Sequence, residues 1–334
     1  MNETLVTPEM KAMLRSCAAE NVAVAQSNQS AFAEFVSEVL RKGILDGDIL
    51  FNIYDVREFG PSEHIEYPLH FLTPGSEKAN IAFTVPALGR IPERQFTGDF
   101  LTVQTYEVAD SVDVPMKFVR DARWDVVGDL LEILKGSFVR KANVDGWRNL
   151  IMAGYARNVI MQDTNATSGL LSKRLAKLME IGMARYAGGN ATSQNRGKLT
   201  DLFMSPEAQA DATNWQIAEV DDFTRRQIFI DGELTKIYGI NIHQLVELGV
   251  GYEFQNYFSN TLKATLPGAG ASQKQELIIG LDLSKKDSFK MPIREQVKIQ
   301  VDPTFQRQRR MSMYGYGEWG FASLDVRRIL LGAI

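Results

Sequence analysis

The stretch between Ile49 and Pro115 is the part of this sequence that most restricts the fold. Prolines at positions 61, 68, 74, 86 and 92 interrupt short β-prone runs such as "ANIAFTV" and "FLTVQTYEV". No helical period survives here, so the pattern predicts a long β-hairpin with irregular edges. A two-stranded ribbon cannot bury enough surface to offset the entropy of ordering roughly 60 residues, at about 1–2 kcal/mol each. The ribbon therefore needs a partner surface, either in its own chain or in a neighbouring copy.

Composition limits the classes of protein to which this chain can belong. The 334 residues are 45% hydrophobic and 23% charged, which is ordinary globular material with enough apolar residues for two modest cores. The 37 basic and 41 acidic residues give a net charge of -4, so tight sequence-specific duplex binding is not expected as the main task. With a single cysteine no internal disulfide can form, and we expect synthesis in a reducing cytoplasm. No signal peptide and no apolar run of membrane-spanning length is recognised, so we expect no membrane partner.

The residues up to about Leu45 predict two short helices separated by the polar tract "AQSNQSA". Thr7 can cap the first helix, Pro8 suits its first turn, and Gly43 ends the second helix. Both apolar stripes are narrow, so the segment is predicted to be an arm that docks on another surface rather than a domain of its own. The predicted stripes consist of Met10, Met13, Leu14 and Cys17 in the first helix and of Phe32, Phe35, Val36, Val39 and Leu40 in the second.

The clearest helix signal runs from Asp121 to Asn158. Its apolar stripe has the i, i+3/i+4 spacing that is typical of a long helix lying across a sheet. Each internal glycine weakens a helix by roughly 1 kcal/mol relative to alanine, so we predict a bend or a break near Asp145-Gly146. A second helix should follow and end at Gly188-Gly189. The two stripes contain Val127, Leu130, Leu131, Leu134 and Phe138, and then Leu171, Leu175, Leu178, Met179 and Met183.

Strands dominate after the linker "GGNATSQNRG", which marks a predicted boundary. The segment "LTDLFMSPEAQADATNW" predicts a short apolar strand and then a helix, with Ser205 as the cap and Pro206 in the first turn. "GINIHQLV" and "QELIIGLDL" predict further strands. The strongest strand is "IREQVKIQV", where apolar and polar residues alternate from Ile293 to Val301. After a turn at Asp302-Pro303, the last residues return as a pairing strand and a final apolar strand.

No group of residues predicts an active site. His64, His70 and His243 are scattered without the spacing of metal ligands, and histidines at the surface or core edge are the favoured interpretation. Cys17 lies on an apolar helix face with no base beside it, so it is interpreted as a small buried hydrophobe. The loops "PGAGAS" and "NRGKL" lack the context of a dinucleotide or phosphate site. We therefore predict no cofactor, no metal and no enzymatic activity.

Basic side chains occur along the long helix at Lys135, Arg140, Lys141 and Arg148. The favoured interpretation is a solvated helix face or pairing with acidic neighbours. The alternative is that this helix faces enclosed DNA. In that case the four residues would make salt-sensitive, sequence-independent contacts with phosphates.

The order of these elements resembles that of the major capsid protein of tailed bacteriophages, the Hong Kong ninety-seven type of capsid fold. The resemblance extends from the arm and the long loop, through "PMKFVRDARWDVVGDLLEILKGSFVRKANVDGWRNLI" in place of the family's spine helix, to "LFMSPEAQADATNW" and the final "RRILLGAI". It implies an α+β fold with an N-terminal arm, an extended E-loop, a P-domain with a long spine helix, and an axial A-domain. The implied boundaries are 1–48 for the arm, 49–115 for the E-loop, 116–196 and 287–317 for the P-domain with its spine helix at about 121–158, and 197–286 and 318–334 for the A-domain.

The resemblance also suggests a partner for the proline-rich ribbon. It implies that the E-loop crosses onto an adjacent subunit, so that ribbon and arm bury their apolar sides on another copy of the same chain. Such head-to-tail contacts can close into rings and, repeated, into a shell. The expected intersubunit contacts are Phe71, Ile81, Phe83, Val85, Ile91, Phe96 and Phe100.

The implied function is structural: self-assembly into the hexamers and pentamers of an icosahedral head that encloses double-stranded DNA. The implied partners are other copies of the chain, a separate scaffolding protein, a portal, a decoration protein in some members, and packaged DNA bound non-specifically. The separate scaffold is expected because the E-loop begins by about residue 49, which leaves no room for a cleaved scaffolding region. The implied location is the virion capsid, assembled in the host cytoplasm. Two alternatives stay open: an encapsulin-like shell around a protein cargo, and a soluble oligomeric enzyme with an unrecognised site.

Overall fold

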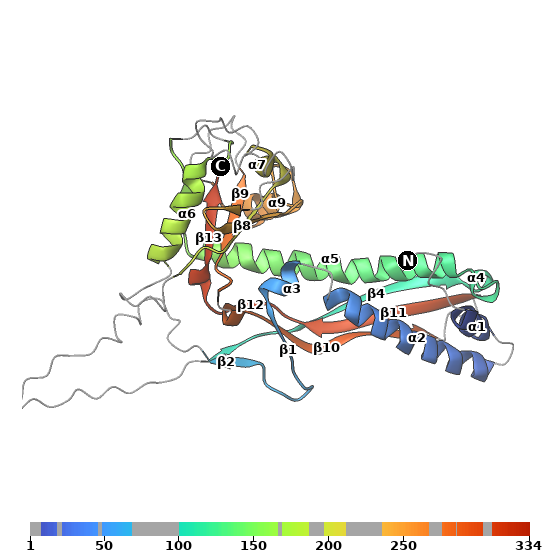
Figure 1. Cartoon of the computed structure of the whole chain (residues 1–334). Coiled ribbons are helices and arrows are strands. Elements are labelled where there is room, and N and C mark those ends of the chain that lie inside the picture. Colours follow the sequence, from blue (N-terminus) through green and yellow to red (C-terminus); the bar gives the residue numbers. More distant parts are fainter. Residues whose placement is uncertain are drawn as a thin grey trace, which may run out of the picture. The chain divides into compact units, whose positions relative to one another are not determined.

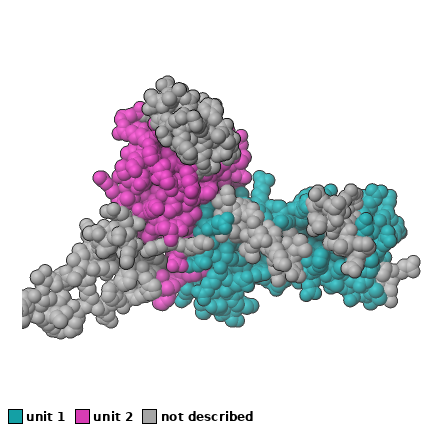
Figure 2. All heavy atoms as spheres, viewed as in Figure 1, with its two compact units in different colours: residues 1–66, 102–146, 290–322 teal, residues 67–101, 147–289, 323–334 magenta. Residues whose placement is uncertain are grey.

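The chain folds into two compact units, which Figure 2 shows in different colours. Both units contain helices and strands, as the predicted α+β class requires (Figure 1). Unit 1 consists of residues 1–66, 102–146 and 290–322, and unit 2 consists of residues 67–101, 147–289 and 323–334. The computed structural model describes residues 8–18, 22–45, 49–68, 100–165, 169–186, 197–211, 236–266, 276–284, 286–302 and 309–334.

A mixed sheet with the strand order β1-β10-β11-β4 forms the centre of unit 1. Strand β11 pairs with β4 without interruption, from Arg310 opposite Pro115 to Trp319 opposite Tyr106. The pairing of β10 with β11 shifts register between Ile293 and Lys298, which indicates a bulge. The strands are β1 (Asp55–Glu58), β4 (Tyr106–Pro115), β10 (Phe289–Asp302) and β11 (Arg310–Trp319).

The alternation predicted for "IREQVKIQV" is confirmed in the second half of β10. Val297 and Ile299 are buried, whereas Lys298 and Gln300 are exposed. Successive side chains of a strand point to opposite faces, so one face of β10 packs on the unit's core and the other meets solvent.

Helix α5 (Trp124–Ala156) corresponds to the predicted long helix, and its residues 124–146 belong to unit 1. The predicted apolar stripe is confirmed at Val127, Leu134 and Phe138, which are buried, whereas its other two members, Leu130 and Leu131, are half-buried. A β-carbon placed on Gly315 of β11 would lie 2.8 Å from the Phe138 ring, so this glycine lets α5 approach the sheet closely. The helix therefore lies against the sheet, as its periodicity predicts.

The break predicted near Asp145-Gly146 is wrong, because α5 is helical without interruption through both residues. Helix α3 (Ile49–Ile53) explains why a glycine is present. A β-carbon at Gly146 would lie 2.5 Å from Cδ2 of Leu50, which is fully buried. The Tyr54 hydroxyl also donates a 2.9 Å hydrogen bond to the Gly146 carbonyl. Gly146 thus serves close packing rather than a break in the helix.

The predicted arm consists of α1 (Pro8–Ser16) and α2 (Val22–Leu45), and polar contacts hold the two helices together. The side-chain amide of Asn28 donates to the carbonyl of Ser16 at 3.1 Å, and that of Gln29 donates to the carbonyl of Cys17 at 2.9 Å. These carbonyls at the end of α1 have no partner further along the helix, so two amides of α2 cap α1.

The arm buries its apolar side within its own chain. Leu14 and Cys17 have no exposed surface, and Phe32 and Val36 are 1% and 3% exposed in the single chain. Helix α2 also reaches the sheet of unit 1, where the backbone N–H of Ile299 donates to Ser37 Oγ at 2.8 Å. The expectation that the arm finds its apolar contacts on another copy is therefore wrong for these residues. Phe35, predicted in the same stripe, is 40% exposed.

The run "FLTVQTYEV" forms two strands instead of one. β3 (Phe100–Thr102) pairs with β2 (Glu66–Pro68), whereas β4 begins at Tyr106 and joins the sheet of unit 1. Between the two strands the chain passes Gly320 so closely that a β-carbon there would lie 2.5 Å from the Gln104 carbonyl oxygen. Of the predicted hairpin at 49–115, the structure describes residues 49–68 and 100–115. The prediction is wrong at both ends of this segment, because α3 is helical and β1 and β4 pair with strands of the unit 1 sheet; only β2 and β3 pair with each other. Residues 69–99 lie outside the described ranges.

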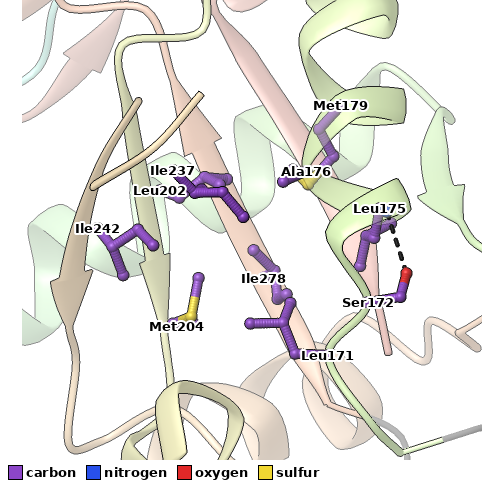
Figure 3. A pocket seen from close by; sticks show the side chains of 10 residues that line it. All are labelled: Leu171, Ser172, Leu175, Ala176, Met179, Leu202, Met204, Ile237, Ile242 and Ile278. Carbon is purple, nitrogen blue, oxygen red and sulfur yellow. Dashed lines mark hydrogen bonds between the residues drawn. The ribbon is translucent and has the colours of Figure 1, made fainter. Parts of the chain in front are cut away.

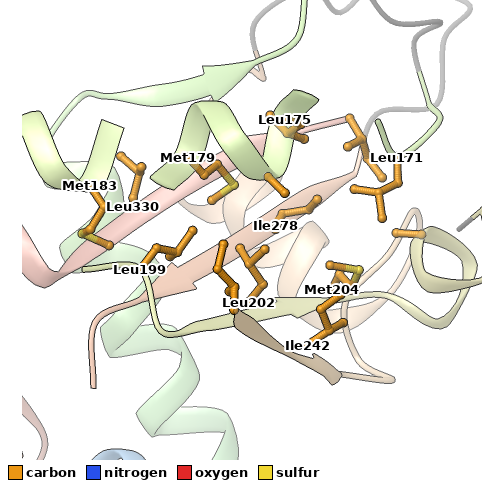
Figure 4. Close-up of a cluster of buried hydrophobic side chains, with 14 residues drawn as sticks. Leu171, Leu175, Met179, Met183, Leu199, Leu202, Met204, Ile242, Ile278 and Leu330 are labelled. Carbon is orange, nitrogen blue, oxygen red and sulfur yellow. The ribbon is translucent and has the colours of Figure 1, made fainter. Parts of the chain in front are cut away.

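Unit 2 contains a six-stranded sheet with the order β5-β13-β9-β6-β8-β7. Side chains of β6 alternate between its two faces. Leu202 and Met204 join the apolar cluster that α6 (Lys173–Tyr186) covers (Figure 4), whereas Phe203 meets Trp147 of α5 in an edge-to-face contact at 4.8 Å. The strands are β5 (Ile160–Gln162), β6 (Asp201–Met204), β7 (Lys236–Ile237), β8 (Ile240–Gln244), β9 (Leu277–Leu281) and β13 (Ile329–Ala333).

The predicted strand-to-helix junction at Ser205 is confirmed. The Ser205 hydroxyl accepts a hydrogen bond from the backbone N–H of Ala208 at 3.0 Å, as an N-cap residue does. Pro206 occupies the first position of the helix that follows. The remaining short elements are α4 (Met116–Arg120), α7 (Pro206–Asp211), α9 (Glu253–Asn256), the π-helical turn η5 (Tyr257–Thr261), the 3-10 turns η6 (Lys286–Ser288) and η8 (Val326–Arg328), and β12 (Ala322–Ser323).

A buried group of charges fixes the start of β13 in unit 2. The Arg328 guanidinium is 5% exposed and forms ion pairs with Asp282, which is fully buried, and with Asp325. Arg157, just past the end of α5, donates to the carbonyl of Arg327 at 3.0 Å. Burial raises the pKa of Asp325 above its usual value, against the lowering effect of Arg327 and Arg328. Because buried charges are tolerated only when they are paired, this network specifies the position of the last strand.

Candidate functional site

His243 is the histidine with the closest carboxylate partner in the described parts of the chain. Its Nε2 lies 2.7 Å from Oδ1 of Asp201 on the neighbouring strand, and its ring stacks on Phe203 at 4.8 Å. Burial alone would raise the pKa of Asp201, but hydrogen bonds from His243, Thr200 and Asn241 lower it below the usual range. The pair links strands β6 and β8, and no described nucleophile completes a catalytic group around it. This agrees with the favoured interpretation of a core-edge histidine.

Ser205 and Glu276 form a hydroxyl–carboxylate pair that could also be considered for chemistry. The Ser205 hydroxyl donates to Glu276 while it caps α7, and Ser205 is 1% exposed. Burial raises the pKa of Glu276, and the negative charges of Glu207 and Asp211 raise it further. A buried hydroxyl that already serves as a helix cap cannot reach a substrate, so the pair is structural.

Cys17 is inert as a nucleophile in this fold. It is fully buried, and burial raises the pKa of its thiol to about 11. Its sulfur donates to the Met13 carbonyl at 3.4 Å. The thiolate is the reactive form of cysteine, so this residue packs as a small hydrophobe, as the sequence predicts.

Two hollows within the described residues lack the features of a ligand site. A cavity of about 10 Å³ lies in the apolar core of unit 2 (Figure 3), which is room for about one water molecule. Its lining is apolar apart from Ser172, whose hydroxyl caps α6 by accepting from Leu175. A more open groove of about 680 Å³ lies between α2 and β10, and its lining mixes both signs of charge with amides and hydroxyls. Across the described ranges no three metal-ligating side chains come together.

Two of the four basic residues predicted on the long helix have acidic partners in the chain. Lys141 pairs with Asp145 at 3.0 Å, one turn further along α5. Arg148 pairs with Glu253 at 3.0 Å and lies over the Tyr257 ring at 5.2 Å. Arg140 is exposed and Lys135 is half-buried. Because a residue turns about 100° on a helix, Lys135 and Lys141 point in directions about 120° apart, so the four cations do not share one face.

Of the seven expected E-loop contacts, the structure describes only Phe100. It lies in β3 with 63% of its surface exposed, next to Leu101, which is 36% exposed. An exposed phenylalanine at this level in a single chain is a candidate for contact with another molecule. The other six expected contacts, Phe71, Ile81, Phe83, Val85, Ile91 and Phe96, lie outside the described residues.

Sequence reasoning missed further exposed apolar side chains. Val246, Val250 and Tyr252 are 60%, 42% and 48% exposed in the loop between β8 and α9 of unit 2. In unit 1, Ile133 on α5 is 63% exposed, although the next residue, Leu134, is fully buried. Helix geometry was the available signal: at about 100° per residue, Ile133 points about 100° away from its neighbour Leu134 and so lies off the buried stripe.

Comparison with known proteins identifies the fold. No protein-family model matches the chain, and no curated protein matches it. Solved structures do match. A chain from Microbacterium phage Oxtober96 aligns with a TM-score of 0.55 at 12% identity, covering 86% of this chain and 90% of that chain. A chain from Mycobacterium phage Bobi aligns with a TM-score of 0.53 at 14% identity, covering 86% and 89%.

A third structure is the asymmetric unit of the bacteriophage PhiM1 mature capsid. It aligns with a TM-score of 0.52 at 9% identity and covers 86% of each chain. At identities this low, what the alignments share is the path of the backbone. Among the described helices, none is long and apolar enough to cross a membrane. The chain has the α+β fold of phage capsid proteins, which confirms the fold that the order of its elements predicts.

Proposed function

We propose that this chain is a major capsid protein that assembles into the icosahedral head of a tailed phage and encloses double-stranded DNA. The observation that carries the proposal is the alignment with the mature capsid of PhiM1, which extends over 86% of both chains. The helices and strands of both units take part in a match of this extent, so the likeness is not confined to a shared sheet.

The assembly contacts that we propose centre on the part of the predicted E-loop (49–115) that lies between β2 and β4, because residues 49–58 and 106–115 pack within unit 1. Phe100 and Leu101 lie exposed in β3 of the β2–β3 ladder, directly after residues 69–99 in the sequence. We propose that this loop packs on an adjacent copy, that residues 116–196 and 287–317 act as the P-domain, and that 197–286 and 318–334 act as the A-domain. The exposed loop at Val246–Tyr252 gives the A-domain an apolar surface of its own.

Contact with DNA would involve few of the basic side chains of α5. Lys141 and Arg148 form ion pairs with Asp145 and Glu253, so their charges are largely compensated within the chain. Contacts from Lys135 and Arg140 would be few, sequence-independent and sensitive to salt. A separate scaffolding protein, a portal and assembly in the host cytoplasm complete the proposal, and they rest on the family resemblance alone.

The proposal is tested by expressing the chain alone and together with a candidate scaffolding protein, followed by negative-stain electron microscopy. Closed shells or rings of five and six copies are expected. A chain that stays monomeric under both conditions would contradict the proposal. Nuclease treatment of purified particles then identifies the content: protected DNA supports a phage head, whereas a protein cargo without nucleic acid supports the encapsulin-like alternative.

A matched pair of variants tests the role of the E-loop in this assay. Phe100→Asp places a charge on a side chain that is already 63% exposed, so the melting temperature of the single chain should hardly change. Shell formation should nevertheless fall strongly, because the charge would be buried against the adjacent copy. Phe100→Leu keeps the apolar character and should assemble. Equal assembly of both variants would exclude Phe100 from the contact.

A further inference from the structure

One stripe of residues on the outward face of α5 is arranged with a polarity that no contact printed among the described residues explains. Asp129, Ile133, Gly136 and Arg140 are all exposed. At about 100° per residue these four positions fall within about 60° of one another, so they form a single line along the helix. The line is acidic at its start, apolar and open in its middle, and basic at its end. In Figure 1 this helix runs along one margin of unit 1.

In the middle of the stripe, an exposed isoleucine side chain lies next to a glycine that has free space around its α-carbon. Ile133 is 63% exposed, and one turn later a β-carbon built on Gly136 would meet nothing within 4 Å. Gly136 has a helical backbone, so no turn or positive φ requires glycine there. A glycine in a helix costs roughly 1 kcal/mol relative to alanine. A glycine with this cost and no close neighbour among the described residues is explained if another surface approaches the helix closely at that point.

The stripe is complementary to itself when two copies of α5 meet antiparallel. With a two-fold axis midway between Ile133 and Gly136, the isoleucine of each copy lies over the glycine of the other. The same axis places Asp129 of each copy opposite Arg140 of the other, because both lie the same number of residues from the axis. One rotation thus produces two knob-into-hole contacts and two ion pairs, as an isologous interface requires.

The charge distribution favours a second copy over nucleic acid as the occupant. Arg140 alone could bind a phosphate, but Asp129 lies about three turns away on the same line and is exposed. A duplex placed along this stripe would meet repulsion over its first half. A second helix with the same sequence meets attraction at both ends, and such complementarity fixes register even where exposed pairs contribute little affinity.

We propose that α5 forms a two-fold contact between copies of this chain, with Ile133 over Gly136 and Asp129 opposite Arg140. The contact goes beyond the proposed head-to-tail ring contacts, since it would join two copies that belong to different rings. It can be tested separately from shell formation, because a pair of copies suffices to form it.

The test uses two cysteine variants, Asp129→Cys and Arg140→Cys, in the full chain, where the native Cys17 is fully buried. Mixed in equal amounts, the two proteins should form a dimer with a short bis-maleimide, because their cysteines face each other across the axis. Each variant alone should stay largely uncrosslinked, since equal positions on the two helices lie about 16 Å apart along the axis. Crosslinking that is equal in all three samples, or lacking in the mixture, would overturn the inference.

Charge exchange identifies the occupant in the same preparations. Arg140→Asp is introduced into the Asp129→Cys variant, and in a separate experiment Asp129→Arg is introduced into the Arg140→Cys variant. Each change leaves the knob-into-hole contact in place but puts two like charges opposite each other, so it should lower the crosslinked yield several-fold. Without cysteines, the double variant Asp129→Arg/Arg140→Asp should associate as well as the original chain by light scattering. If the stripe bound DNA instead, Asp129→Arg would strengthen retention of a random-sequence duplex, which is the opposite sign and would overturn the inference.

Electron microscopy of the same samples separates this inference from the proposed function. Shells without the Asp129–Arg140 crosslink would overturn the two-fold contact and leave the capsid proposal standing. Crosslinked pairs that never form shells would support the contact and contradict the capsid proposal.

Discussion

Helix α5 carries two glycines whose surroundings are opposite. Gly146 faces Leu50, so closely that a β-carbon would lie 2.5 Å away, whereas a β-carbon on Gly136 would meet nothing within 4 Å. The same contrast holds for the two faces of the helix in unit 1, where Phe138 is 1% exposed and Ile133 is 63% exposed. One face is thus committed to the fold of the single chain, and the other is available to a second molecule. Substitutions on the two faces should therefore separate folding from assembly.

Phe138→Ala should have the largest effect on the stability of the unassembled chain. The ring packs edge-to-face on Trp319 at a centroid distance of 6.3 Å and contacts the site of Gly315. Removing a buried phenylalanine costs about 3–5 kcal/mol, because both the apolar transfer and the cavity oppose folding. Urea unfolding followed by tryptophan fluorescence measures this loss.

Ile133→Ala is the matched control on the outward face. Its effect on unfolding should stay within about 0.5 kcal/mol, since an exposed side chain makes few contacts. If Ile133→Ala lowered the free energy of unfolding as much as Phe138→Ala, the contrast between the two faces would be wrong, because the outward face would then already be covered in the single chain.

The glycine pair should respond with opposite signs. Gly146→Ala gains helix propensity of roughly 1 kcal/mol, but it forces the buried Leu50 to move, and overpacking costs about 1–3 kcal/mol. A net loss of about 1 kcal/mol is expected. Gly136→Ala meets no contact, so it should raise the free energy of unfolding by about 0.5–1 kcal/mol. Chemical denaturation of both variants measures the difference.

The double variant Leu50→Ala/Gly146→Ala tests the cause of the loss. With the leucine shortened, the added methyl group has room, so the alanine at 146 should no longer destabilise relative to Leu50→Ala alone. A loss that persists in this background would mean that Gly146 is needed for its backbone instead of for the approach of Leu50.

Periodicity predicted most of the fold because the local pattern and the packing agree. Val127, Leu134 and Phe138 of the predicted stripe are buried. Ser205 caps its helix, and Val297 and Ile299 of β10 face the core. Each of these signals depends on neighbours in the sequence. The capsid fold itself followed from the order of the elements, which reflects their connections more than any single motif.

Contacts between distant segments could not be predicted in the same way. The local pattern predicts a helix break at Gly146. The prediction fails because the partner of this glycine, Leu50, is almost a hundred positions earlier in the chain, and no local pattern indicates that contact. The arm was expected on another copy, yet Ser37 binds the backbone of Ile299 in the same chain. An apolar stripe shows that a surface will be covered, but it does not show which chain covers it. The candidate DNA contacts were similarly ambiguous, since Arg148 has its acidic partner Glu253 far along the sequence.

Tyr106 lies at the border between the two faces and should give the smallest effect. Its hydroxyl donates to Asp145 of α5 at 2.7 Å, and the Lys141 ammonium lies 6.0 Å from its ring centre. Burial raises the pKa of Tyr106 well above its usual value, and the hydrogen bond and negative charge of Asp145 raise it further. Tyr106→Phe removes one hydrogen bond, so at neutral pH it should cost about 0.5–1 kcal/mol.

The pH dependence gives this last variant its sharper readout. A tyrosine whose pKa is raised on folding holds its proton more tightly in the folded chain than in the unfolded chain. Its contribution to stability is therefore complete below about pH 10, the pKa of an unfolded tyrosine, and is lost as the pH rises above that value. Tyr106→Phe should flatten part of the fall in melting temperature above pH 10, while Tyr54, whose pKa burial also raises, retains the rest. Identical alkaline profiles for the original chain and the variant would show that the flank of α5 is solvated, and that only its inward face is tied to the sheet.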